Sequence, residues 1–142
     1  MKKRIFGFVL ALVMLGGSIC AMAAELTPRA SLYLDGYGIS ISPDGNSKMS
    51  VTYIVYGTKT MDCLGAQKIL VEEWNGQDWE KTGTYSAEKN PDFYAYEASE
   101  HIGTVTFYGL PGIQYRATLT AYAELNGGSD TGTVTCTPKT CK

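Results

Sequence analysis

The thiols are the first groups in this 142-residue chain whose type and spacing suggest a definite chemistry. The chain has four cysteines: Cys20, Cys63, Cys136 and Cys141. Cys20 lies in an N-terminal segment that we expect to be removed, which leaves an odd number. An odd number allows one intramolecular disulfide and one free thiol, or three reduced thiols in an anaerobic habitat. A zinc site needs tighter Cys and His spacing than these residues supply.

The groups that could act as general acids or bases form no catalytic pattern. His101, the one histidine, follows Glu97 and Glu100 in a polar stretch, where a solvated loop is the simpler interpretation. Glu72 and Glu73 are neighbours on a predicted strand, so they point to opposite faces and cannot act as a glycosidase pair. Nucleophile-elbow and HExxH motifs are absent from the sequence. We therefore expect no enzyme, no cofactor and no metal site, and a hydrolase is the least favoured function.

Aromatic side chains offer a binding chemistry instead. The chain holds ten Tyr and two Trp. Several fall at predicted solvent-facing positions, in the polar stretch, or beside a hairpin: Tyr56, Tyr94, Tyr96, Tyr122, Trp74 and Trp79. Exposed rings on a rigid sheet can stack on sugars or anchor a protein partner. The alternative, commoner in sheets, is that these rings cover a thin core and pair across strands.

The N-terminus has the three parts of a secretory signal peptide. A basic KKR start is followed by an apolar run over residues 5–15 and by small residues that end at Ala23. The apolar run is shorter than the roughly 20 residues that a membrane-spanning helix needs. We expect cleavage after Ala23 and no stable membrane insertion. The predicted location is extracellular, with the protein either released or held at the cell surface.

Cleavage leaves an acidic chain of a size that suits one domain. Residues 24–142 keep nine of the 12 Lys and Arg against all 14 Asp and Glu, so the net charge falls from −2 to −5. Nucleic-acid binders usually carry a basic cluster, and no such cluster is present. We predict a single domain over residues 24–142 that binds no nucleic acid.

The pattern of this domain is that of short antiparallel strands. Runs rich in Val, Ile, Thr and Tyr alternate with clusters of Gly, Asn, Asp and Pro. Two strands have a clear inward set, which comprises Met49, Val51, Tyr53 and Val55, and then Tyr115, Ala117, Leu119, Ala121 and Ala123. Asn75-Gly76 predicts a hairpin, and a bulge is expected near Gly36. Residues 58–66 and 86–101 are expected to be loops.

The last third of the chain resembles fibronectin type III and related immunoglobulin-like β-sandwiches. The resemblance rests on the LPG corner before Tyr115, the alternating strand that follows, and the NGGSD turn. It implies an all-β antiparallel sandwich in which the Tyr115 hydroxyl bonds to backbone upstream. It also implies that Cys63 lies in a loop at the end opposite the C-terminus. That placement disfavours a bond to Cys141 and favours a Cys136–Cys141 disulfide, with Cys63 an exposed free thiol.

The whole mature chain is also similar to an uncharacterised family of small secreted proteins from Gram-positive bacteria. The segments that carry this resemblance are RASLYLDGY, YGTKTMDCLGAQKI, WNGQDW, HIGTVTFYGLPG and YAELNGGSDTGTV. The resemblance implies export and a bacterial source, and it supplies no functional residues. We expect a secreted binding domain for an extracellular protein or glycan. The alternative is a structural or matrix component that self-associates through strand edges or as a Cys63-linked homodimer.

Overall fold

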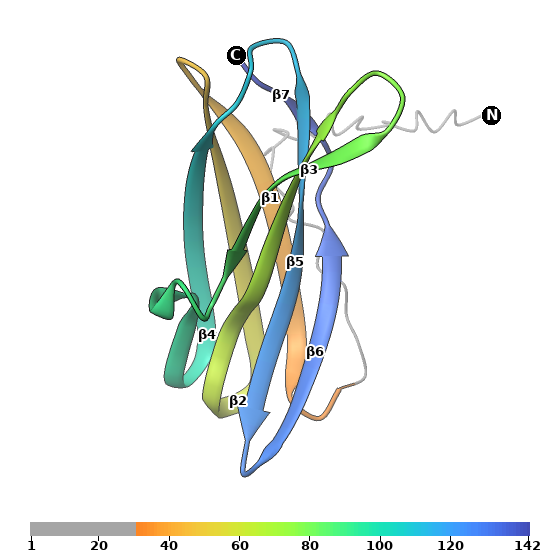
Figure 1. Cartoon of the computed structure of the whole chain (residues 1–142). Coiled ribbons are helices and arrows are strands. Elements are labelled where there is room, and N and C mark those ends of the chain that lie inside the picture. The colour runs from red at the N-terminus through yellow and green to blue at the C-terminus, as the bar shows by residue number, and fades with distance from the viewer. Residues whose placement is uncertain (1–30) are drawn as a thin grey trace, which may run out of the picture.

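The computed structural model describes residues 31–142, so the predicted signal peptide over residues 1–23 lies outside the described part. In the described range the elements are β1 (Leu34–Gly45), β2 (Lys48–Trp74), β3 (Trp79–Ser86), the 3₁₀ turn η1 (Pro91–Phe93), β4 (Tyr94–Tyr108), β5 (Gln114–Leu125), β6 (Gly128–Thr135) and β7 (Lys139–Thr140). All strand pairs are antiparallel (Figure 1), which confirms the all-β prediction. Within residues 31–142 no helix has the length and apolar character needed to cross a membrane.

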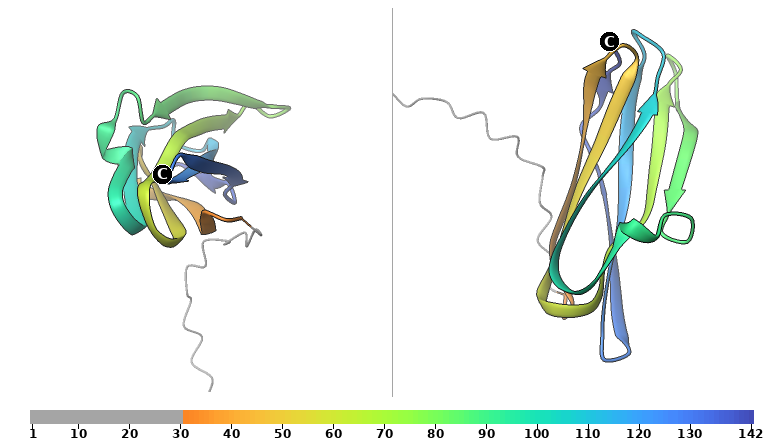
Figure 2. Two further views of the ribbon diagram at one scale, coloured as in Figure 1. Left: turned by 90° about the horizontal axis from the view of Figure 1, so that it is seen from below. Right: turned by 90° about the vertical axis from the view of Figure 1, so that its left-hand side faces the viewer.

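The sheet curls because the long strand β2 pairs with two different sets of neighbouring strands. Residues 48–56 pair with β1 and with residues 100–108 of β4, whereas residues 63–73 pair with β5. β3 pairs with residues 68–74 of β2, and β6 lies beyond β5. Figure 2 shows the consequence from one end, where the strands wrap around a common interior.

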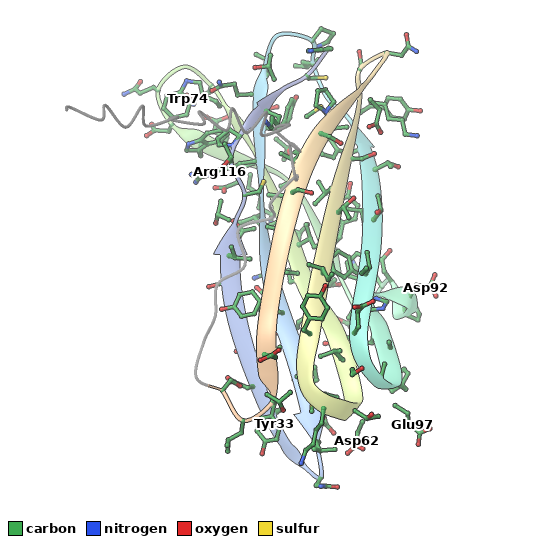
Figure 3. All side chains as sticks on the ribbon, turned by 180° about the vertical axis from the view of Figure 1, so that it is seen from behind. Tyr33, Asp62, Trp74, Asp92, Glu97 and Arg116 are labelled. Carbon is green, nitrogen blue, oxygen red and sulfur yellow. The ribbon has the colours of Figure 1, made fainter. Side chains whose placement is uncertain are left out.

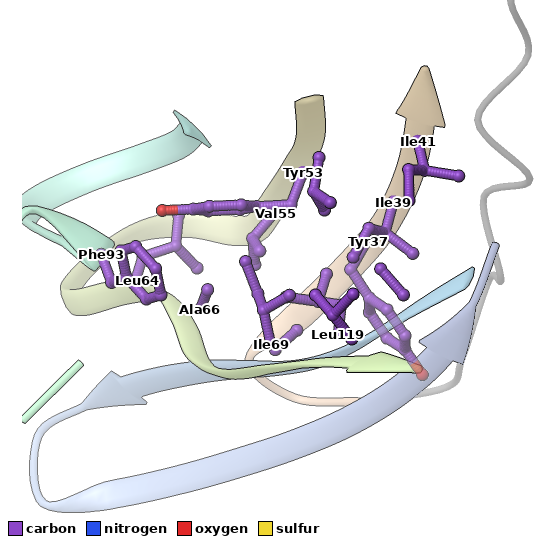
Figure 4. Close-up of a cluster of buried hydrophobic side chains, with 14 of the residues drawn as sticks. Tyr37, Ile39, Ile41, Tyr53, Val55, Leu64, Ala66, Ile69, Phe93 and Leu119 are labelled. Atoms are coloured by element: carbon purple, nitrogen blue, oxygen red, sulfur yellow. The ribbon is translucent and has the colours of Figure 1, made fainter. Parts of the chain in front are cut away.

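The interior is filled by the alternating positions that the sequence predicts. The two predicted inward sets are all buried, and the residues are Met49, Val51, Tyr53, Val55, Tyr115, Ala117, Leu119, Ala121 and Ala123. β1 adds Tyr37, Ile39 and Ile41 after a bulge between Leu34 and Gly36. In Figure 4 these side chains meet those of β2 and η1 in one cluster. Side chains at every second position along each strand therefore form the core.

Two predicted turns close hairpins as expected. At the β2–β3 hairpin the Asn75 side-chain oxygen accepts hydrogen bonds from the backbone N–H of Gln77 and Asp78, at 2.8 and 2.7 Å. At the β5–β6 hairpin Asn126 and Gly127 both have positive φ, 52° and 79°. Asn and Gly adopt this left-handed conformation at low cost, which is why these sequences turn where they do.

The corner before β5 also forms as predicted. The backbone N–H of Leu110 donates to the Tyr115 hydroxyl at 2.9 Å, and that hydroxyl donates to Glu73 at 3.2 Å. The ring of Tyr115 packs against Phe107 with centroids 5.3 Å apart. Tyr115 therefore ties the β4–β5 connection to the core.

The prediction that residues 58–66 form a loop is wrong. β2 continues through them with a register shift between Tyr56 and Met61. Four residues of the segment are buried core: Met61, Cys63, Leu64 and Ala66. Here β2 passes from one set of neighbours to the other and is covered on both faces, so the apolar residues run together instead of alternating.

The polar stretch 86–101 is ordered, and only its first part is irregular. Residues 87–93 form a short excursion from the sheet that contains a turn and η1, after which β4 begins at Tyr94. The Ser86 carbonyl accepts hydrogen bonds from the N–H groups of Lys89 and Asn90 at 3.1 and 3.0 Å, and from the Asn90 side chain at 2.9 Å. This segment, which we call the excursion, stands out from the side of the molecule in Figure 1.

Candidate functional site

A groove of about 630 Å³ lies between the excursion and the outer face of the sheet. β2 contributes Gln67 and Lys68 to it, and β5 contributes Thr120. The remaining lining residues are Ser86, Ala87, Glu88, Pro91, Tyr94 and Tyr96. This volume is within the range of about 300–1,000 Å³ that small-molecule sites occupy. We call it the tyrosine groove.

The register of three strands brings Tyr94, on the lining of the groove, against Tyr122. Gly65 of β2 is paired with Tyr94 on one side and with Tyr122 on the other. The two rings meet across this glycine with centroids 5.5 Å apart and planes tilted by 41°. Tyr96 is two residues after Tyr94 and lines the same groove, with 69% of its surface exposed. Glu97, within the same strand, has a positive φ of 50°.

The outer wall of the groove is held close to the sheet by Gly65. A Cβ on Gly65 would lie 1.9 Å from the carbonyl oxygen of Phe93, at the end of the excursion. Phe93 itself is buried, and its ring packs edge-on against Tyr53 with centroids 5.6 Å apart. The wall is therefore fixed by a core side chain and by a backbone contact that only glycine permits.

The phenols of Tyr94 and Tyr122 stay neutral at physiological pH, because the pKa of each is raised. The Tyr122 hydroxyl donates to Glu124, and this bond, together with burial, raises the pKa of Tyr122 to about 12. Burial, with smaller contributions from Cys63 and other neighbours, raises the pKa of Tyr94. The ionisable groups on the lining besides the tyrosines are one lysine, Lys68, and one glutamate, Glu88. The site is thus aromatic and polar, with balanced charge.

The two tryptophans lie elsewhere and pack against their own neighbours. Trp74 and Trp79 form a cross-strand pair with ring centroids 5.3 Å apart. The guanidinium of Arg116 sits 4.4 Å above the Trp79 ring and is held there by a 2.9 Å bond from its Nε to Glu72. Figure 3 shows Trp74 and Arg116 together, well separated from Asp92 on the excursion. For these two rings the cross-strand interpretation describes the observed geometry.

Tyr56 is also remote from the groove. It is partly buried on β2, where it pairs with Gly36 of β1 and Glu100 of β4. Of the six aromatic residues singled out in the sequence, the structure therefore places Tyr94 and Tyr96 on the lining of the groove and Tyr122 against the ring of Tyr94. It places Tyr56, Trp74 and Trp79 apart from them.

All three described thiols are unpaired. Cys63 is on a strand and only 9% exposed, so its predicted place in an exposed loop is wrong, and burial raises its pKa. Cys136 and Cys141 lie beside the start of β5: the N–H of Cys136 donates to Ala117 of β5, and that of Cys141 donates to Ile113, the residue before β5, both at 2.9 Å. The Cys136–Cys141 disulfide stays a prediction.

The acid–base candidates have structural partners. His101 is on β4 rather than in the predicted loop, and its Nε2 lies 3.1 Å from the hydroxyl of Tyr53. Glu72 binds Arg116, and Glu73 accepts from Tyr115. Within residues 31–142 no three His, Cys, Asp or Glu side chains gather where they could hold a metal ion.

Comparisons with protein-family models, with curated proteins and with solved structures found no match for this chain. The groove must therefore be interpreted from its own chemistry.

Sequence reasoning missed the polar side of the groove. Gln67 and Lys68 were not candidates, because a bulge between Ala66 and Lys68 breaks the alternation there. Thr120 falls on the outward face that alternation predicts for its strand, but nothing local marks it as part of a groove. The one local signal was Asn90-Pro91 within a polar stretch. An Asn-Pro step favours a turn that leaves the sheet, and such a turn can form a wall.

Proposed function

We propose that this chain is an exported, non-enzymatic binding domain and that the tyrosine groove holds its ligand. The observation that carries the proposal is Tyr96, a large ring that lines a groove of ligand size while 69% of its surface is exposed. A ring left this open contributes little to the core, whereas a rigid aromatic surface is a common anchor for a ligand. Its strand places the ring at the groove before any ligand arrives.

We further propose that the curled sheet is a sandwich of the fibronectin type III or immunoglobulin-like kind. Two features support this assignment. β2 changes partners midway, so that β1, its first part and the end of β4 form one group of strands, while β3, its second part, β5 and β6 form another. The hydrogen bond from Leu110 to the Tyr115 hydroxyl is the corner that the resemblance implies.

Export and a bacterial source belong to the same proposal. They are supported by the signal pattern over residues 1–23 and by the resemblance to secreted proteins of Gram-positive bacteria. Expression of the full chain in a Gram-positive host tests both cleavage and location. The intact mass of the product in the medium should correspond to a chain that starts at Ala24. Product retained in the cell with residues 1–23 still attached would contradict export.

The groove is tested by binding of the exported protein to an array of extracellular proteins and glycans. Spots that the unchanged protein binds should lose the signal with Tyr96→Ala. Tyr108→Ala is the matched control, because Tyr108 is on the same strand, is 78% exposed and lies outside the groove. If no bound spot distinguishes these two variants, the groove is not the binding site.

A further inference from the structure

We infer that the ligand of the tyrosine groove is a glycan, held through the flat face of an uncharged pyranose ring. The inference rests on the proposed function and adds the chemical class of the ligand. It comes from three properties of the groove taken together: the aromatic surfaces, the balance of charge, and the state of the backbone groups in its walls.

The aromatic surfaces suit a ring that is apolar on its face and polar at its rim. Tyr96 lies open to solvent, and Tyr94 is braced from behind by Tyr122 at a ring separation of 5.5 Å. The axial C–H groups of a pyranose pack on the electron-rich face of such a ring, as other apolar or positively polarised groups do. Its equatorial hydroxyls then point outward. Side chains that exchange hydrogen bonds with hydroxyls line the same groove: Gln67, Lys68, Ser86 and Thr120.

The charge balance argues against an ionic ligand. Lys68 and Glu88 are of opposite sign, and the mature chain is acidic overall. Phosphate and sulfate groups are bound by clusters of Arg and Lys, and a single lysine beside a glutamate is a poor site for them. The groove therefore selects against nucleic acids, phospholipid headgroups and sulfated polymers.

The excursion side of the groove argues against a peptide that binds there by strand addition. Such a peptide needs free backbone donors and acceptors along the site. In the wall the Gln67 carbonyl accepts from Ala87 at 3.1 Å, the Ser86 carbonyl accepts three hydrogen bonds, and the Asn90 carbonyl accepts from Phe93 at 3.0 Å. These three carbonyls are used within the chain, so along the excursion a ligand must be recognised by side chains. Among the described residues β4 has β2 as its one strand partner, so the peptide arm of the test covers its other edge. Proteins recognise sugars through aromatic rings and side-chain hydrogen bonds.

The test uses the exported protein and defined probes. Oligosaccharides of glucose, galactose and N-acetylglucosamine are the neutral probes; heparin and polyphosphate are the anionic ones; a set of extended peptides covers the remaining class. Affinities are measured by titration calorimetry. The variants are Tyr96→Ala, Tyr96→Phe and the matched control Tyr108→Ala.

We expect at least one neutral oligosaccharide to bind. Tyr96→Ala should weaken that binding by about tenfold or more, the usual effect of losing an aromatic anchor. Tyr96→Phe should retain most of it, because the ring face and not the hydroxyl makes the contact. Tyr108→Ala should leave it unchanged. Circular dichroism and thermal melting of Tyr96→Ala should match the parent, since the side chain is exposed.

Two results would overturn the inference, and they differ in what they leave standing. Peptide or anion binding that depends on Tyr96, without neutral sugar binding, would make the ligand class wrong but keep the groove as the binding site. Binding of every probe class unaffected by Tyr96→Ala, or no binding to any of them, would contradict both the ligand class and the proposed function. A loss with Tyr96→Phe as large as with Tyr96→Ala would also contradict stacking on the ring face.

Discussion

Replacement of Gly103 by alanine tests how tightly β4 is fitted to the core. Gly103 is the strand partner of Tyr53, whose ring lies directly beneath it. A Cβ on Gly103 would be 2.3 Å from the Tyr53 hydroxyl oxygen and 2.4 Å from Cζ, well inside van der Waals contact. The backbone of Gly103 has no positive φ, so the cost of the substitution comes from this contact alone.

The Tyr53 ring is held by contacts on two sides. It is 1% exposed, its hydroxyl is 3.1 Å from His101 Nε2, and Phe93 packs against its face. Overpacking of a close-packed core costs about 1–3 kcal/mol. For a domain of this size we expect Gly103→Ala to lower the free energy of unfolding by about 2 kcal/mol and the melting temperature by roughly 10 °C.

Gly83→Ala is the matched control. Gly83 is also on a strand that pairs only with β2, and a Cβ there would meet nothing closer than the Tyr85 ring at 3.8 Å. We expect its stability to stay within about 0.5 kcal/mol of the parent or to rise, because alanine restricts the unfolded chain. Urea unfolding followed by circular dichroism measures both variants. Equal effects of the two substitutions would refute the packing argument.

Three further predictions concern the corner, the pH response and the thiols. Tyr115→Phe should lower the free energy of unfolding by about 1–2 kcal/mol in urea melts, because the Leu110 N–H loses its partner; an unchanged midpoint would refute this. Burial raises the pKa of Tyr53 from 10.0 to about 12, so the neutral phenol favours the fold. This stabilisation by the neutral Tyr53 phenol is complete below pH 10 and is lost as pH rises through about 12. Tyrosinate absorbance and thermal melts across this pH range should show the loss of stability, and a Tyr53→Phe variant should lack that loss. Buried Cys63 and Cys141 should react with a thiol reagent only in denaturant, and fast labelling without it would contradict the packing.

The local patterns of the chain were enough to predict the strands that have one buried face. Buried and outward-facing residues alternate cleanly over Met49 to Val55 and Tyr115 to Ala123, because one face of each strand packs in the core and the other faces solvent. The turns at Asn75-Gly76 and Asn126-Gly127 followed from the backbone preferences of those residues. The Tyr115 corner was predicted from its resemblance to known corners.

The prediction failed where a strand passes between two sets of partners or carries apolar residues outward. In residues 61–66 both faces of β2 are covered, so the period of two disappears. In residues 94–101 of β4 no residue is fully buried and Tyr96 is 69% exposed, so no inward-facing set marks the strand. Such segments look like loops in the sequence, because alternation is the signal that marks a strand.

By itself the sequence determined the strand class, the hairpin turns and an inventory of aromatic residues with no catalytic pattern beside them. Only the tertiary structure decided which of those rings form a site. Tyr94 and Tyr122 meet because β4 and β5 both pair with β2 at Gly65, a register that depends on contacts between distant parts of the chain. Trp74 and Trp79, equally prominent in the sequence, are covered by each other and by Arg116. Residue type is local, whereas proximity and exposure are set by strand pairing across the whole domain.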